Sequence, residues 1–420
     1  MYTWKVDSYF EKKLLIWADK FSYVTFLNPN GWQNSYPQGA FPKMLAVANE
    51  ALQQSFLAEN LPQHSWLFGY LGYDLKNQIE QLESNNPNPQ EQPESVCFQP
   101  LHLFIWQDEN NILIESPLPS EKLWQDIHSN EAYLMKNQKI KISERTDFEL
   151  YKKNVESIKT YIKEGDVYEL NYCIEFYAEN ISIEPIFTYL ALNERTKMPF
   201  SSFLKAQEHY VLCASPERFL KKSGKKVVSQ PIKGTIRRGK TFEEDENLKY
   251  ILKNSPKEIA ENMMIVDLVR NDLARSAEIG SVQVSELFGI YSFEKLHQMI
   301  STVEATISSD TSPQKVIHHA FPMGSMTGAP KIRAMQLIEQ HENSKRGIYS
   351  GAIGFFSPTG DFDFNVVIRS IFYNAYKNYL SFWVGSAITY DADASQEYQE
   401  CLLKASAIRD ILENPQNIFL

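Results

Sequence analysis

The chain has little cysteine, no long apolar run and no excess of positive charge. Its 420 residues include only four cysteines, and no two of them form a CxxC pair. This spacing predicts neither a zinc site nor a redox motif, and so few cysteines are typical of a reducing compartment. No apolar stretch approaches the roughly 20 residues that a membrane-spanning helix needs. We therefore expect a cytoplasmic protein that does not enter a membrane.

The charge balance and the first residues exclude further classes. The chain carries 42 basic and 52 acidic residues, a net charge of −10. That balance counts against a nucleic-acid surface, which usually needs a basic face. The segment from Met1 to Asp7 lacks a basic region followed by an apolar run, so we expect no signal peptide. A small anionic substrate would still bind where a metal ion or a cationic cluster offsets the field.

The two parts of the chain differ in pattern. Residues 1–140 alternate aromatic-rich, strand-like runs with turns, whereas clearer helical and strand patterns follow from Asp147 onward. Length alone suggests two or three domains. A polar stretch between Glu83 and Glu94 predicts an exposed loop. The pattern from Phe148 to Lys163 predicts an amphipathic helix.

A hairpin is predicted where a polar turn, Lys221–Lys226, separates two strand-like runs. If the turn centres on Gly224, Glu217 lies opposite Pro231. Lys233 is then the diagonal neighbour on the same face, roughly 7–8 Å away. This register allows a pocket flanked by a carboxylate and an amine. It equally allows an exposed cross-strand ion pair, which is the commoner outcome of such spacing.

A helix is predicted to begin at Ser255. Ser255 at the N-cap, Pro256 at the first position and Glu258 at the third form a capping box, so Glu258 has a structural explanation. Glu261 lies one turn further along on the same side and does not share that explanation. The buried stripe of this helix is expected to consist of Ile259, Met263, Val266 and Val269.

The last helix is predicted to begin near Asp393 and carries a second acidic pair. Glu397 and Glu400 are three residues apart, and Glu400 is spaced for an ion pair with Lys404. A solvated acidic face explains this pattern. Alternatively, the two glutamate pairs converge on Mg²⁺, which takes oxygen ligands and often one or two protein carboxylates. Periodicity does not choose between these interpretations.

Seven motifs occur in an order that resembles the chorismate-utilising enzymes. They are Ser215-Pro-Glu-Arg-Phe219, Pro231-Ile-Lys-Gly-Thr235, Ala260-Glu-Asn-Met-Met-Ile-Val-Asp-Leu-Val-Arg-Asn-Asp272, His297-Gln-Met-Ile-Ser-Thr302, Pro322-Met-Gly-Ser-Met-Thr-Gly-Ala-Pro-Lys331, Arg346-Gly-Ile-Tyr-Ser-Gly351 and Glu397-Tyr-Gln-Glu400. The match covers residues 150–410 well and the N-terminal third loosely. One such motif would be weak, but seven in order are specific.

The resemblance implies an α+β fold. We expect a single large domain of two packed antiparallel β-sheets with helices outside and the active site between the sheets. Residues 1–140 would form the N-terminal portion of this fold, and residues 141–420 the chorismate-binding catalytic region.

Within this family the residue after Pro-Ile separates two activities. Anthranilate synthases resemble Pro-Ile-Ala-Gly-Thr, whereas the aminodeoxychorismate synthase branch typically has Pro-Ile-Lys-Gly-Thr, as here with Lys233. The resemblance therefore implies amination of chorismate to 4-amino-4-deoxychorismate, for p-aminobenzoate and folate synthesis. The alternatives are an anthranilate synthase component and a catalytically inactive, chorismate-binding homologue.

The resemblance also assigns roles at the reacting centre. Lys233 would attack the substrate covalently, and Glu217 would act as general acid and base. The attacking amine must be neutral, so we expect burial or a nearby Mg²⁺ to lower its pKa. Glu261 and Glu400 match the magnesium ligands. Glu258 and Glu397 match positions that contact the ion through water.

Substrate-binding positions carry over in the same way. Backbone groups near Gly234 and Thr235 would help hold the ring carboxylate. Tyr349, Arg369 and the backbone at Gly385 match the site for the pyruvyl carboxylate, where an arginine offers a bidentate fork. The remaining pocket-lining positions are His297 and Lys404.

One position departs from the family pattern, and one motif is absent. Position 169 is Glu, where amine-adding relatives usually have Gln and isochorismate or salicylate synthases have a water-activating Lys. Glu169 thus counts against the latter two activities, and we expect it to perturb the pKa of Lys233. No glutaminase nucleophile motif surrounds any cysteine, so ammonia should come from a separate glutamine amidotransferase subunit.

Overall fold

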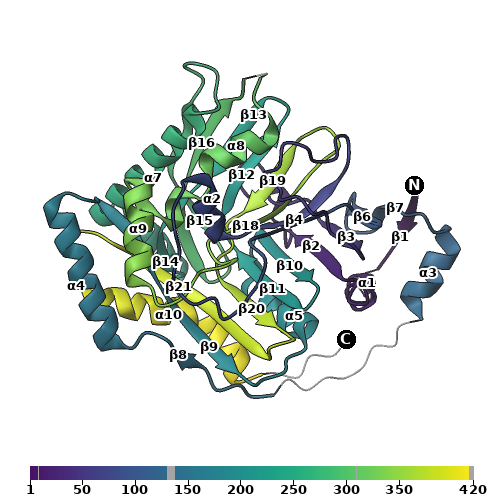
Figure 1. Cartoon of the computed structure of the whole chain (residues 1–420), viewed down its shortest axis with the longest axis horizontal. Coiled ribbons are helices and arrows are strands. Elements are labelled where there is room, and N and C mark those ends of the chain that lie inside the picture. The colour runs from purple at the N-terminus through teal and green to yellow at the C-terminus, as the bar shows by residue number, and fades with distance from the viewer. Residues whose placement is uncertain (8, 130–137, 309, 416–420) are drawn as a thin grey trace.

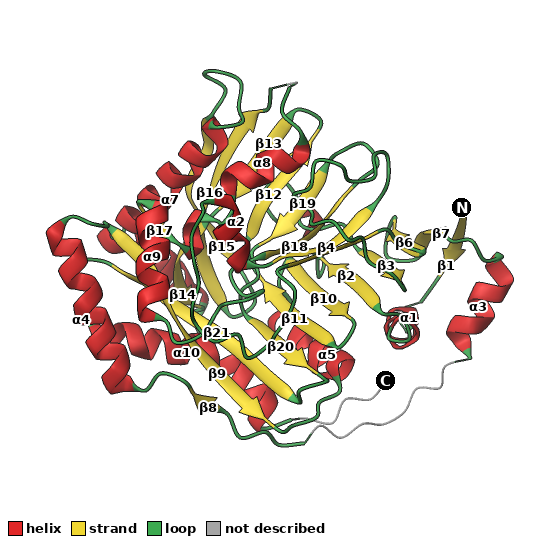
Figure 2. Ribbon diagram, viewed as in Figure 1, coloured by secondary structure: helices red, strands yellow, loops and turns green. Residues whose placement is uncertain are grey.

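The computed structural model describes residues 1–7, 9–129, 138–308 and 310–415, and within them two antiparallel sheets dominate (Figures 1 and 2). The larger sheet has 12 strands in the spatial order β1 (Tyr2–Lys5), β7 (Asn111–Glu115), β6 (His102–Trp106), β3 (Met44–Ala48), β2 (Tyr23–Asn28), β10 (Phe200–Ala206), β11 (His209–Ser215), β20 (Ser370–Asn374), β21 (Tyr379–Ile388), β9 (Glu169–Glu179) and β17 (Gly328–Ala329), with β8 (Ser143–Glu144) beside β9.

The smaller sheet has nine strands among the described residues. Their order is β14 (Ile232–Arg237), β16 (Leu296–Thr306), β13 (Lys226–Gln230), β12 (Arg218–Ser223), β19 (Phe362–Asn365), β18 (Ala352–Phe356), β4 (Leu67–Leu71) and β5 (Ser95–Phe98), with β15 (Gln283–Ser292) beside β16. Strands from the first 140 residues join both sheets. The chain is thus a single domain, and the length-based expectation of two or three domains is wrong.

Helices lie outside the sheets, as the resemblance implied. Those in the described part of the chain are α1 (Phe10–Ala18), α2 (Lys76–Ile79), α3 (Ser120–His128), α4 (Phe148–Glu164), α5 (Pro185–Thr196), α6 (Phe242–Lys253), α7 (Pro256–Ala274), α8 (Pro313–Ala320), α9 (Lys331–His341) and α10 (Ala394–Glu413), with 3₁₀ turns η1 (Trp32–Asn34), η2 (Tyr73–Leu75) and η3 (Gly324–Met326). In the described residues, no helix is both long and apolar enough to cross a membrane.

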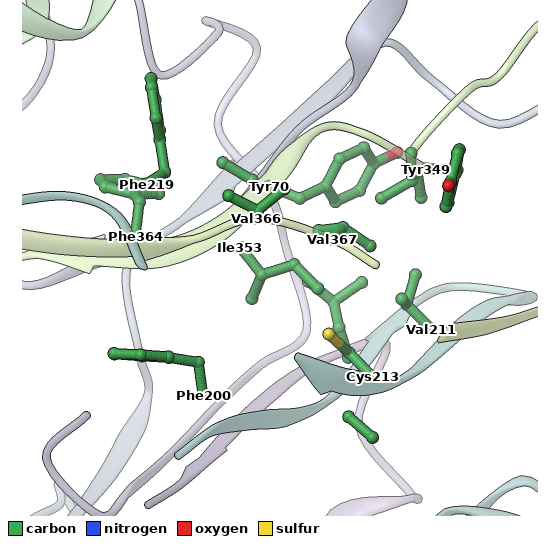
Figure 3. Packing of buried hydrophobic residues seen from close by; sticks show 14 of the residues in the cluster. Tyr70, Phe200, Val211, Cys213, Phe219, Tyr349, Ile353, Phe364, Val366 and Val367 are labelled. Atoms are coloured by element: carbon green, nitrogen blue, oxygen red, sulfur yellow. The ribbon is translucent and has the colours of Figure 1, made fainter. Parts of the chain in front are cut away.

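The space between the sheets is filled by apolar side chains. Figure 3 shows Phe200 and Val211 of the larger sheet facing Ile353 and Phe364 of the smaller one. All four are at most 1% exposed. This packing of two sheet faces removes apolar area from water and fixes the sheets relative to each other. It also sets where β14 and β9, which carry Lys233 and Glu169, meet.

Local signals in the sequence account for several elements. The predicted helix from Phe148 is confirmed as α4, with the Asp147 side chain accepting a hydrogen bond from the Leu150 N–H at its start. Gly165 ends the helix at φ +84°, a left-handed conformation that glycine adopts without strain.

The predicted hairpin is also confirmed. Ser223 pairs with Lys226 across the turn, and Arg218 pairs with Gln230 after an intervening bulge. Glu217 is the next residue beyond Arg218, in the predicted register opposite Pro231. The strand breaks at Pro231, and β14 continues along β16.

The polar segment 83–94 is not simply an exposed loop. Gln90 and Gln92 are buried, at 7% and 9% exposure. The Gln90 amide donates to the Phe372 carbonyl (3.2 Å) and to Ser381 Oγ (2.9 Å). The segment therefore lies against β20 and β21, because its amides satisfy polar groups of that sheet.

Candidate active site

An ion pair joins the two sheets at the predicted site. Lys233 Nζ on β14 lies 2.9 Å from Glu169 Oε1 at the start of β9. The lysine side chain is 12% exposed and the glutamate side chain 2%. Glu169 Oε2 is buried without a hydrogen-bond partner. The pair is thus withdrawn from water but only half satisfied.

The charges around Lys233 determine its protonation. Burial tends to lower the pKa of Lys233, but Glu169, Glu261 and Glu217 together outweigh burial and raise it. The expected fall in pKa is therefore not found in this arrangement. Lys233 is a protonated amine here, held by the nearest carboxylate.

Glu217 has the protonation behaviour of a general acid or base. It is buried, and its carboxylate accepts a hydrogen bond from Ser325 Oγ (2.7 Å) and another from the Ile232 N–H. Burial raises the pKa of Glu217 to about 7, although these bonds and the charges of Lys233 and Arg369 oppose the rise. Ser325 has no role in the sequence-based site, even though it lies inside the 322–331 motif.

The backbone around Glu217 explains its position. The Glu217 N–H donates to Ser215 Oγ (3.2 Å), and the Glu217 carbonyl accepts from the Val366 N–H (3.0 Å). The next side chain, Arg218, forms a bidentate pair with Asp363 at 2.9 and 3.0 Å. Since β12 begins with Arg218, the neighbouring Glu217 is held at the strand end by its own backbone bonds.

Gly234 brings a helix close to β14. At φ +96°, a Cβ added to Gly234 would lie 3.1 Å from Glu258 Oε2, so any side chain here would be strained and crowded. Ser255 Oγ does accept from the Glu258 N–H (3.4 Å), which confirms half of the predicted capping box. The Glu258 carboxylate itself reaches the Gly234 backbone.

In helix α7, one residue of the predicted buried stripe is exposed, and the candidate ligand Glu261 is buried. Met263 is 45% exposed, so its place in the predicted buried stripe is wrong, while Glu261 is buried. Glu261 Oε1 has no hydrogen-bond partner. Burial raises the pKa of Glu261 to about 7, with Lys233 opposing and Glu169 adding to the shift.

Helix α10 supplies the second acidic pair. Glu397 is buried, and its Oε1 lies 3.1 Å from Lys257 Nζ of α7. Glu400 Oε1 lies 2.7 Å from Lys404 Nζ, which confirms the predicted i,i+4 pair. Lys404 also donates to the Gly385 carbonyl (2.8 Å), so that carbonyl is tied to α10.

These carboxylates can hold a metal ion only together with other ligands. Among the described residues, no three His, Cys, Asp or Glu side chains converge closely enough to bind one by themselves. The unpartnered Glu261 Oε1 and the half-exposed Glu400 fit an ion that takes one or two protein carboxylates plus substrate oxygens and water. The donor set therefore fits Mg²⁺ shared with an anionic substrate.

A separate cationic group suits a substrate carboxylate. Burial lowers the pKa of Arg369 to about 10, with Glu217 opposing, so the guanidinium stays charged at neutral pH. It forms no hydrogen bond or ion pair with any residue in the described ranges. Tyr349 is buried, and its ring stacks on that of Trp383 with a distance of 5.9 Å between the ring centroids (Tyr349 is labelled in Figure 3).

Gly385 and Thr235 have clear backbone settings. A Cβ on Gly385 would lie 2.4 Å from Cys173 Sγ on the adjacent β9, so only glycine fits there. Thr235 is exposed and pairs with Gln298 of β16.

His297 is not open to a substrate in this structure. Its Nδ1 lies 2.8 Å from Ser292 Oγ and its Nε2 lies 2.9 Å from Asp245 Oδ1, and the ring is fully buried. Both ring nitrogens therefore have protein partners, the arrangement of a core histidine.

The comparisons with known proteins identify the family of the chain. A family model for chorismate binding enzymes matches residues 19–410. Aminodeoxychorismate synthase component 1 of Bacillus subtilis is 33% identical over 82% of this chain and 76% of its own length. The component 1 of Escherichia coli is 32% identical over 84% and 78%.

Plant relatives are much longer than the matched region. The chloroplastic aminodeoxychorismate synthase of Arabidopsis thaliana is 44% identical over 62% of this chain, which spans only 28% of the plant protein. A solved anthranilate synthase component I from Streptococcus pneumoniae superposes with a TM-score of 0.75 over 97% of this chain and 92% of that one, at 23% identity, which supports the fold. By its matched family model and its bacterial relatives, the chain belongs to the chorismate binding enzymes.

Proposed function

We propose that this chain is component 1 of an aminodeoxychorismate synthase. It would convert chorismate and ammonia to 4-amino-4-deoxychorismate, which leads to p-aminobenzoate and folate. The observation that carries the proposal is the largely buried Lys233 between the sheets, which is hydrogen-bonded to the carboxylate of Glu169. Glu217, whose pKa is raised to about 7, acts on the same lysine through its charge. We place the reaction in the cytoplasm.

The proposed chemistry has two displacements. Neutral Lys233 attacks C2 of the ring, both conjugated ring double bonds shift, and the C4–O bond breaks as Glu217 gives its proton to the leaving hydroxide. Ammonia then attacks C4, both double bonds shift back, and the C2–N bond breaks to release the Lys233 amine. One difficult displacement becomes two easier ones, and C4 keeps the new amine.

Lys233 must first lose a proton, and Glu169 is the acceptor in place. The 2.9 Å contact lets the proton pass from Nζ to Oε1 without intervening water. Glu169 thus restrains the amine at rest, because it favours the charged form, and assists when substrate arrives. This role replaces the water activation that the same position serves in lysine-bearing relatives.

The ring carboxylate and the pyruvyl carboxylate of chorismate would be bound at two ends of the site. Glu261 and Glu400 would bind Mg²⁺, with Glu258 and Glu397 bonding its waters, and the ion would neutralise the ring carboxylate. The Arg369 guanidinium, which is charged and has no ion-pair partner within the described ranges, would bind the pyruvyl carboxylate. Tyr349 and Gly385 line that end.

Ammonia would come from a separate glutamine amidotransferase subunit. The bacterial relatives are named as component 1 of their enzyme. An anthranilate synthase component is the second candidate, because one from Cereibacter sphaeroides is 30% identical over 84% of this chain. Lys233, absent from the Pro-Ile-Ala-Gly-Thr pattern, favours the first.

Product analysis separates the candidates. The protein is incubated with chorismate, Mg²⁺ and an ammonium salt, and the products are identified by mass spectrometry. We expect 4-amino-4-deoxychorismate and no free pyruvate. Anthranilate with pyruvate would establish the second candidate instead. Absence of turnover by folded protein would favour an inactive homologue.

A further inference from the structure

Two acidic helices, α7 and α10, meet at the proposed metal site through the Lys257–Glu397 ion pair. α7 contributes Glu258 and Glu261, and α10 contributes Glu397 and Glu400. Burial raises the pKa of Glu258, and the charge of Glu400 adds to that rise, so the two helices act on each other electrostatically. Like charges repel, and this arrangement needs a cation between the helices.

Lys257 already provides such a cation. Its Nζ lies 3.1 Å from Glu397 Oε1 and 3.8 Å from Glu261 Oε1. Among the described residues, Lys257–Glu397 is the only ion pair that joins α7 to α10. Two other lysines lie near these carboxylates: Lys233 is paired with Glu169, and Lys404 is bound to Glu400 of its own helix and to the Gly385 carbonyl.

The contact between Lys257 and Glu261 is weak. A separation of 3.8 Å is too long for a hydrogen bond, and Glu261 Oε1 has no such partner. The Lys257 side chain is 51% exposed, so its ammonium group can move into water. Half-exposed pairs contribute little free energy and are easily exchanged.

We propose that the Lys257 ammonium group is a counter-cation for the carboxylates of α7 and α10, and that a divalent cation displaces it from Glu261. This inference rests on the magnesium site proposed above. Both cations need the same Glu261 oxygen, so they compete for it. The lysine keeps α7 on α10 and prevents four carboxylates from driving the helices apart, and the site stays shaped for the ion.

The competition is tested by magnesium affinity rather than by turnover. Isothermal titration with Mg²⁺ alone compares the full-length wild type with Lys257→Met, which keeps the length of the side chain but removes its charge. We expect about three- to tenfold tighter Mg²⁺ binding in the variant, because the competitor is gone. Lys253→Met, at the exposed end of α6, removes the same charge away from the site and should leave the affinity unchanged.

A second measurement follows the contact between the helices. In EDTA, Lys257→Met and Glu397→Gln should each lower Tm by about 2 °C, and the double variant should be no less stable than either single one. With saturating Mg²⁺ the Lys257→Met difference should disappear. A structural role unrelated to the ion would leave it unchanged.

The outcomes distinguish a failure of the proposed lysine–magnesium exchange from a failure of the proposed magnesium site. Equal Mg²⁺ affinity in wild type and Lys257→Met overturns the exchange while leaving the magnesium site intact. An equal gain in Mg²⁺ affinity in Lys253→Met would mean that the change in net charge causes the effect, and this result also overturns the proposed exchange. No Mg²⁺ binding by folded wild type, either alone or with chorismate present, overturns the site itself.

Discussion

The Arg218–Asp363 and Lys233–Glu169 ion pairs are both largely withdrawn from water, but they differ in how completely their hydrogen-bonding capacity is used. Arg218 binds both Asp363 oxygens and donates to Gln230 Oε1 at 2.6 Å. Lys233 makes one contact with Glu169, whose second oxygen has no partner. A fully bonded pair specifies structure, whereas a half-bonded one leaves capacity for a ligand or for chemistry.

Removing the amine of the half-bonded pair should have the largest effect. Lys233→Ala is expected to lower kcat by roughly a thousandfold or more, because the covalent route is lost. Steady-state kinetics with chorismate and ammonium measure this. Lys253→Ala, an exposed lysine on α6, serves as the control. Near-normal turnover of Lys233→Ala would refute the nucleophile role.

Breaking the fully bonded pair should instead destabilise the fold. Arg218→Met leaves Asp363 buried without its cation, at an expected cost of about 3–5 kcal/mol in the free energy of unfolding. Denaturant unfolding of the variant and wild type gives the difference. A variant with wild-type stability but no activity would reverse the roles assigned to the two pairs.

Glu217 should make stability depend on pH. The pKa of Glu217 in the folded protein is about 7, above its ordinary value of 4.5. The folded state therefore binds the proton more tightly than the unfolded state, and this contribution to stability is lost as pH rises through 7. As pH rises from below 4.5 through 7, wild type should lose up to about 3 kcal/mol relative to Glu217→Gln. Parallel stability curves of the two proteins would contradict this.

Replacing Glu169 should give the smallest effect of the series. Glu169→Gln keeps a hydrogen-bonding group but removes the carboxylate that takes the lysine proton, so we expect about a tenfold loss of kcat at neutral pH. Because the pKa of Lys233 falls without that charge, activity should recover as pH rises. A pH profile unchanged from wild type would leave Glu169 a purely structural partner.

Elements whose position depends on a local sequence signal could be predicted from the sequence. Asp147 and Gly165 mark the ends of α4, and the turn at Gly224 together with the bulge between Arg218 and Lys221 sets the register that brings Glu217 beside β14. Ser255 gives the start of α7. In each case the determining contact lies within a few residues of the chain.

The rest depends on contacts between distant segments. Ser325 reaches Glu217 across 108 residues, and Gln90 reaches Ser381 across 291. Periodicity predicted that Met263 of α7 is buried, but it is exposed, whereas Glu261 is buried near the charges of Lys233 and Lys257. No pattern in one segment reveals such partners, because burial of a polar group is decided by what lies opposite it.

The most direct measurement traps the covalent intermediate. Wild-type protein is incubated with chorismate and Mg²⁺ without ammonia, and intact-mass and peptide mass spectrometry locate any adduct. The proposed mechanism predicts a gain equal to chorismate minus water on Lys233, which added ammonium releases as 4-amino-4-deoxychorismate. Turnover without any adduct at Lys233, or an adduct that persists in Lys233→Ala, would contradict it.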